Sequence, residues 1–182
     1  IWLSSDPACQ GAYGVELWSY TGKKLKTWKG DFDLPALGSR QVLSLPVGEI
    51  LSHIPVPMGR GKGEGKVNED PFDLRASVFL RYTAHSGKHS SEGTLHLAPL
   101  KRVDLPKAKI TVKPSPQSLV LSTSAPVFAL ELRSPLTGHF SDNYFDLLPG
   151  EKKKLRFVPE GKPVSAAALR KGLRLRSIRD TY

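Results

Sequence analysis

Prolines are spread along the whole sequence, fifteen in 182 residues, and they limit the length of any helix. An interior proline lacks the amide hydrogen that a helix needs, and its ring clashes with the preceding turn. Between the prolines lie short runs of β-branched, aromatic and alternating apolar residues, a pattern typical of an all-β chain. The apolar content of 39% and the charged content of 24% are ordinary for a globular chain. The sequence therefore predicts a β-rich globular fold and excludes a disordered or collagen-like chain.

The first half of the sequence contains strand candidates separated by turn signals. We expect strands at residues 14–20, 25–28, 40–45, 74–82 and 93–97. Gly22 lies between the first two and supplies the positive φ of a hairpin turn. Residues 58–70 contain four glycines and mixed charges without apolar periodicity, which predicts a flexible loop.

A second unit begins near Lys107. We expect its strands at residues 110–112, 118–122, 127–132, 152–158 and 173–178. One short helix is predicted over 166–171, with Ser165 as N-cap and Gly172 as the stop after it. This number of strands fits two consecutive immunoglobulin-like (Ig-like) antiparallel sandwiches, over residues 1–106 and 107–182.

The charge of the chain is strongly basic, with a net charge of +10 and a pI of about 9.8. Ten Lys and Arg against three acids lie within residues 151–182. Several of them alternate with apolar residues at the spacing of a half-buried strand, which indicates the solvated face of a sheet. No zinc-ligand spacing, recognition helix or aromatic RNA-binding signature accompanies the charge, so we expect no nucleic-acid partner.

The ends of the sequence and its single cysteine do not decide between cellular compartments. The sequence begins with Ile1 and its only methionine is Met58, so we expect it to begin inside a longer polypeptide, without a signal peptide in this segment. Cys9 is the only cysteine and allows no intrachain disulfide. No apolar run approaches the roughly 18 residues of a membrane span, and we expect none. Periplasmic, secreted and cytoplasmic locations all fit.

Residues 140–151, FSDNYFDLLPGE, resemble the hallmark of the C-terminal Ig-like domain of β-mannosidases in glycoside hydrolase family 2. We call them the hallmark segment. The ending LRLRSIRDTY resembles the close of that domain. IWLSSD, GVELWSYTGKKL and LHLAPLKRVDLP are similar to the sandwich that precedes it. The sequence departs from the family where an aromatic residue is expected at Leu95 or His96, and the loop at 58–70 looks like an insertion.

The resemblance implies that the chain carries no catalytic residues of its own. Such enzymes are retaining glycosidases with two glutamates about 5 Å apart on an α/β barrel. A barrel needs roughly 250 residues of alternating strands and helices, and this sequence has no such alternation. The resemblance implies partners in the barrel and N-terminal domains of a parent enzyme. It also implies an oligosaccharide substrate at the parent's active site, where terminal β-D-mannose is released.

The acidic and histidine side chains give no independent sign of catalysis. No pair of acids, zinc-ligand spacing, nucleophile motif or phosphate loop is present, so we expect neither a metal nor a cofactor. The hallmark segment is expected to be structural through seven residues: Asp142, Asn143, Tyr144, Phe145, Asp146, Pro149 and Gly150. The first two are expected to bond nearby backbone. One of the adjacent aromatics is expected in the core, while the Tyr144 hydroxyl pins a crossover loop as in a tyrosine corner. Pro149-Gly150 fits the centre of a type II turn.

Three aromatic residues offer a possible sugar-stacking surface. Trp18 and Tyr20 share one face of a strand with Glu16, and Trp28 is a candidate third member. Two interpretations stay open: a platform for sugar rings, or packing against the second sandwich or the barrel. The alternative to an enzyme module is therefore a free-standing carbohydrate-binding or adhesion sandwich. A basic nucleic-acid binder is the third and least favoured class.

Overall fold

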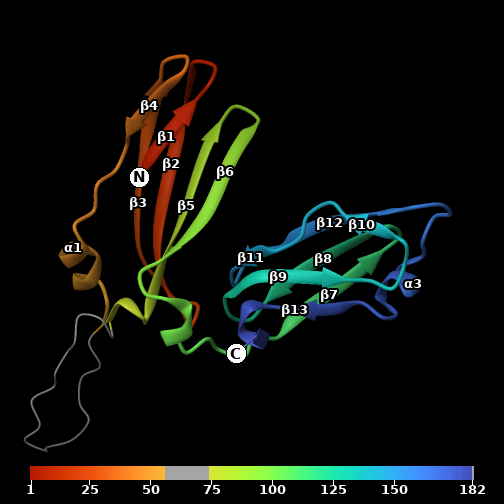
Figure 1. Ribbon diagram of the computed structural model, residues 1–182. Helices are drawn as coiled ribbons and strands as arrows, with labels where there is room; N and C mark the ends of the chain where they lie inside the picture. The colour runs from red at the N-terminus through yellow and green to blue at the C-terminus, as the bar shows by residue number, and fades with distance from the viewer. Residues whose placement is uncertain (56–73, 182) are drawn as a thin grey trace, which may run out of the picture. The chain divides into compact units, whose positions relative to one another are not determined.

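The computed structural model describes residues 1–55 and 74–181, which form two compact units (Figure 1). Unit 1 comprises Ile1–Ser19 and Lys23–Asp104, and unit 2 comprises Tyr20–Gly22 and Leu105–Tyr182. Both units are built from antiparallel sheets, which confirms the all-β prediction. The loop expected at 58–70 lies outside the described residues. A division into domains at residues 106 and 107 stays a prediction.

Unit 1 contains a four-stranded sheet and a two-stranded sheet. The larger sheet has the order β3 (Lys24–Leu34), β2 (Cys9–Ser19), β5 (Val78–Ser86) and β6 (His89–His96), side by side in Figure 1. The smaller sheet pairs β1 (Trp2–Ser5) with β4 (Gly38–Gln41). The predicted hairpin is present, and Gly22 has a φ of +91°.

The core of unit 1 lies on one face of β2 and β5. Val15 and Leu17 are fully buried there together with Val78, as the period of two requires. The helix α1 (Val47–Ser52) contributes Ile50 to the same core. This helix is not among the predicted elements, because a β-branched residue and a glycine begin it. The burial of Ile50, rather than intrinsic helix propensity, stabilises this helix.

All five expected strands of unit 1 correspond to observed ones, but β2, β3 and β6 are longer than expected and the other two are displaced along the chain. The strand expected at 40–45 ends at Gln41, and the Tyr13 hydroxyl donates to the Val42 carbonyl at 2.9 Å. The strand expected at 74–82 begins only at Val78, and it lies inside the four-stranded sheet between β2 and β6. Residues 74–75 are helical and residues 76–77 form a turn, in which the amide and hydroxyl of Ser77 both donate to the Leu74 carbonyl.

Unit 2 consists of two sheets that enclose one core. One sheet has the order β10 (Gly138–Phe140), β12 (Lys153–Pro159), β8 (Ser118–Thr123) and β7 (Ile110–Ser115). The other has the order β11 (Phe145–Leu147), β9 (Val127–Arg133) and β13 (Arg174–Arg176). Fully buried leucines of β8, β9 and β12 meet between the sheets: Leu119, Leu121, Leu130 and Leu155.

The predicted C-terminal helix is present as α3 (Ala166–Arg170). The Ser165 hydroxyl accepts a hydrogen bond from the Ala168 amide at 3.2 Å, and Leu169 is fully buried. Gly172 follows with a φ of +82°. Two 3-10 turns, η1 (Leu100–Arg102) and η2 (Ile178–Thr181), complete the described elements, and none of the described helices has the length and apolarity to cross a bilayer.

Candidate functional site

The hallmark segment is fixed to β9 by side chains. Asn143 binds both backbone groups of Leu132: its Oδ1 accepts from the amide at 2.7 Å, and its Nδ2 donates to the carbonyl at 3.1 Å. Asp146 Oδ1 accepts from the Ala129 amide at 2.9 Å. The two side chains therefore extend the short pairing of β11 with β9, and they act as anchors.

A β-bulge in β9 explains why the Ala129 amide needs the Asp146 side chain as its partner. The register changes between the Phe145–Leu130 pair and the Leu147–Val127 pair. Ala129 lies in the bulge with a φ of +47°, outside the regular ladder, and its amide would be unpaired without Asp146.

The ends of the hallmark segment are closed by local contacts. Asp142 Oδ1 accepts from the Asn143 amide at 2.8 Å, and Asp142 Oδ2 forms an ion pair with Lys153 Nζ at 2.8 Å. Gly150 has a φ of +89°, and the Glu151 amide donates to the Leu148 carbonyl at 3.1 Å, the geometry that a type II turn requires. The Glu151 carboxylate accepts in return from the Leu148 amide at 3.0 Å.

The adjacent aromatics of this segment point in opposite directions. Phe145 is 9% exposed and belongs to the core, whereas Tyr144 is 63% exposed. The Tyr144 hydroxyl donates to Glu131 Oε1 at 2.6 Å, and Arg133 Nε donates to the same oxygen at 2.9 Å. The Tyr144 hydroxyl therefore binds a carboxylate on β9, and the expected link to a crossover loop is wrong in this detail.

These hydrogen bonds shift the ionisation of both partners. The hydrogen bond from Tyr144, and then that from Arg133, holds the pKa of Glu131 below its ordinary value. The same bond raises the pKa of Tyr144, because ionised Glu131 disfavours a phenolate. A carboxylate held in its ionised form cannot serve as a general acid at neutral pH. The hydrogen bond from Tyr144 to Glu131 anchors the hallmark segment to β9.

The structure does not bring the three candidate stacking residues together. Trp18 is 8% exposed, and its indole donates to Glu16 Oε2 at 2.9 Å. Tyr20 is 4% exposed, and burial raises its pKa. Trp28 lies opposite Val15, on the other face of the sheet from Glu16 and Trp18. A joint platform is excluded because two rings are covered and the third faces elsewhere.

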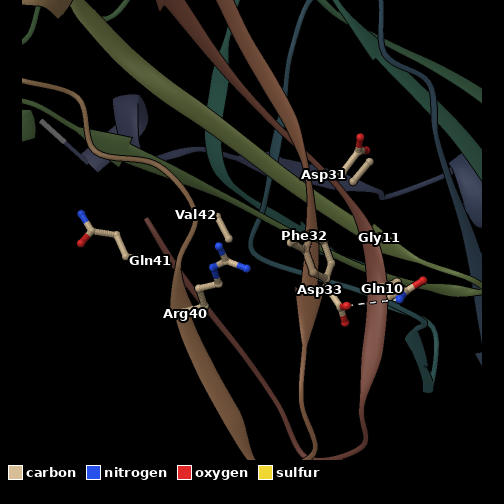
Figure 2. A pocket seen from close by; sticks show the side chains of 9 residues that line it. Gln10, Gly11, Asp31, Phe32, Asp33, Arg40, Gln41 and Val42 are labelled. Carbon is tan, nitrogen blue, oxygen red and sulfur yellow. Dashed lines mark hydrogen bonds between the residues drawn. The ribbon is translucent and has the colours of Figure 1, made fainter.

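A pocket of about 820 Å³ lies in unit 1 between β2, β3 and residues 40–42 (Figure 2). Figure 2 shows Arg40 on one wall, and on the other Gln10, whose amide donates to Asp33 Oδ2 at 3.3 Å. Asp31 and Asp33 are both exposed to solvent. No described group of three His, Cys, Asp or Glu is placed to hold a metal ion.

Two residues that matter in the structure were not identified from the sequence. Glu131 is 7% exposed, but its partner Tyr144 is thirteen positions away, and no local motif marks such a pair. Trp2 is 66% exposed. Its signal was present, because the alternation of β1 places this indole on the same face as Ser4.

Comparison with known families decides where the chain belongs. Residues 1–102 match the model of the mannosidase Ig/CBM-like domain. The chain belongs to this family. Residues 100–181 match a second model, the Ig-fold domain of mannosidases. The two units are therefore Ig-like domains of mannosidase-family enzymes, and the resemblance seen in the hallmark segment is confirmed.

Solved structures share the fold of these mannosidase Ig domains. A β-D-mannosidase from Dictyoglomus thermophilum aligns with a TM-score of 0.61 and 16% identity, over 96% of this chain and 19% of its own. An exo-chitosanase from Amycolatopsis orientalis, in complex with PNP-β-D-glucosamine, aligns with a TM-score of 0.50 and 12% identity, over 97% of this chain and 23% of its own. The search of curated proteins finds no match. The chain thus spans about a fifth of the structures that it resembles.

Proposed function

We propose that the chain provides the non-catalytic C-terminal modules of a β-mannosidase-like glycoside hydrolase. The observation that carries the proposal is the tandem order of two mannosidase Ig families, over residues 1–102 and 100–181. The parent enzyme would cleave terminal β-D-mannose residues with retention, on a barrel outside this chain. The β-mannosidase of similar fold has room for such a barrel, since this chain corresponds to 19% of it.

The partners in this proposal are the barrel and N-terminal domains of the parent, with the oligosaccharide bound at the parent's active site. The modules pack against the barrel and help to shape its entrance. The role of the hallmark side chains supports a scaffold, since Asn143 and Asp146 bind backbone groups. The basic residues Arg174 and Arg176 are exposed on β13 on either side of Leu175, which fits a solvated face of the sheet.

The test is hydrolysis of p-nitrophenyl β-D-mannoside by this chain and by the full-length protein that contains it. We expect activity in the full-length protein alone. An aryl β-D-glucosaminide is the matched substrate, because an exo-chitosanase shares the fold. Release of glucosamine instead of mannose would change the sugar in the proposal, and inactivity on both substrates would contradict an enzyme module.

The second candidate is a carbohydrate-binding or adhesion module. The description of the matching family, an Ig/CBM-like domain, supports it. The platform first expected at Trp18 and Tyr20 does not, because both rings are buried. Retention of the isolated chain on a mannan affinity gel, without any hydrolysis by the full-length protein, would favour this candidate.

A further inference from the structure

A second pocket of unit 1, about 310 Å³, combines an exposed indole with polar side chains that are histidines and serines. Trp2 of β1 contributes the indole, and the β5–β6 hairpin contributes His85, His89 and Ser90. The buried rings and methyls of Phe32 and Leu34 supply an apolar floor. We call this cavity the Trp2 pocket. Its size is at the lower end of small-ligand sites, which begin at about 300 Å³.

The Trp2 pocket has no Lys, Arg, Asp or Glu in its lining. This is unusual in a chain with 27 basic and 17 acidic residues. The pocket of Figure 2, by contrast, is lined by Asp31, Asp33 and Arg40. Because the lining has no permanently charged side chain, a charged ligand would lose hydration there without gaining a fixed opposite charge, so the lining favours a neutral ligand.

The polar side chains of this lining have free hydrogen-bonding capacity. Ser86 donates its hydroxyl to the Gln10 carbonyl at 2.7 Å. His85, His89 and Ser90 form no side-chain hydrogen bond with any residue that the structure describes. An imidazole and a hydroxyl can each donate and accept, so these groups match a ligand rich in hydroxyls.

We propose that the Trp2 pocket binds a neutral saccharide. A sugar ring has an apolar C–H face and an edge of hydroxyl groups. The indole of Trp2, 66% exposed, packs against the apolar face, and the histidines and serine of the hairpin bind the hydroxyls. The pocket adds a sugar-binding site to modules whose proposed role is that of a scaffold.

The test measures saccharide binding to the whole 182-residue chain. β-1,4-Mannotriose and cellotriose are the neutral probes, and D-glucuronic acid is the charged comparison. Titration is followed by 1H–15N spectra and calorimetry. We expect a neutral probe to shift the Trp2 indole signal and the amides of the hairpin tip, with weaker effects from the acid.

Matched variants locate the site. Trp2→Ala should weaken binding about tenfold, as expected for an aromatic anchor at the centre of a contact. Leu95→Ala also removes an exposed apolar side chain, 53% exposed on β6, but lies outside the pocket lining and should bind as wild type. If Trp2→Ala fails to fold, His89→Ala with Ser90→Ala tests the same pocket from its exposed rim.

Three results would overturn the proposal: no shift with either neutral probe, equal affinity of wild type and Trp2→Ala, or preferential binding of the acid. Each is independent of mannoside hydrolysis by the full-length protein. The proposed function and the saccharide site can therefore fail separately.

Discussion

The β2–β3 hairpin of unit 1 and the hallmark segment of unit 2 hold their strands in different ways. The hairpin has ten residue pairs in its ladder, from Cys9–Leu34 to Trp18–Lys24. β11 has two pairs with β9, and the side chains of Asn143 and Asp146 supply further bonds. A long ladder tolerates many outward-facing residues because the backbone makes the bonds. A short one depends on particular side chains, and this is the physical reason that the hallmark segment is a specific motif.

The largest expected effect comes from two phenylalanines of equal burial. Phe32 on β3 and Phe145 on β11 are each 9% exposed. Either change to alanine should cost about 3–5 kcal/mol of its unit's stability. Only Phe145→Ala should also release its strand, because β11 has few ladder bonds. Amide hydrogen exchange should then rise over residues 140–148, while β2 and β3 stay protected in Phe32→Ala. Equal loss of protection in both strands would contradict the comparison.

Asn143→Ala should have the next largest effect. It removes the two hydrogen bonds to Leu132, and we expect a loss of about 1–2 kcal/mol. Asn143→Asp keeps an acceptor for the Leu132 amide and should lose less. Urea unfolding followed by circular dichroism measures both. Tryptophan fluorescence serves as an internal control, since Trp2, Trp18 and Trp28 all lie in unit 1. If only the unfolding transition seen by tryptophan fluorescence shifted, the substitution would destabilise unit 1 and not unit 2, which would contradict the prediction.

The same contrast explains what the sequence could predict. The pattern of short apolar runs between turn signals identified β2, β5, β8, β9 and β12, and alternate residues are indeed buried in β8 and β12. It missed β10 and β11, each three residues long, and it missed α1, whose stability comes from Ile50 in the core. Recognition of the hallmark segment located the anchors, but not Glu131, whose contact with Tyr144 exists only after β9 and β11 pair. The sequence pattern also did not predict which indole is exposed, since Trp18 is buried and Trp2 is not.

The bond between Tyr144 and Glu131 should make a smaller contribution that depends on pH. The pKa of Glu131 lies below its ordinary value of 4.5 in the folded state. The bond therefore stabilises unit 2 fully above about pH 4.5, and this stabilisation is lost as the pH falls through the folded-state pKa. Tyr144→Phe should lower the melting temperature at pH 7 and make little difference in strong acid.

Glu131→Gln is the control for this titration. Glu131→Gln removes the ionisable group. The change in melting temperature that Tyr144→Phe causes in this variant should therefore not vary across the acid range. Asp180, whose pKa is also lowered by a hydrogen bond from the Ser177 amide, is present in all of these proteins and cancels in the comparison. A pH-independent difference between wild type and Tyr144→Phe would show that the hydroxyl does not act through the carboxylate.

The ion pair between Asp142 and Lys153 should have the smallest effect. Their side chains are 41% and 30% exposed, and exposed pairs of this kind contribute about 0.2–1 kcal/mol. Solvent screening places the expected loss in Asp142→Asn near the lower limit, and added salt should abolish it. The amide of this variant still offers an oxygen to the Asn143 amide, so the local turn is preserved. A loss as large as that of Asn143→Ala, measured at high salt, would mean that charge and not backbone capture holds the hallmark segment on β9.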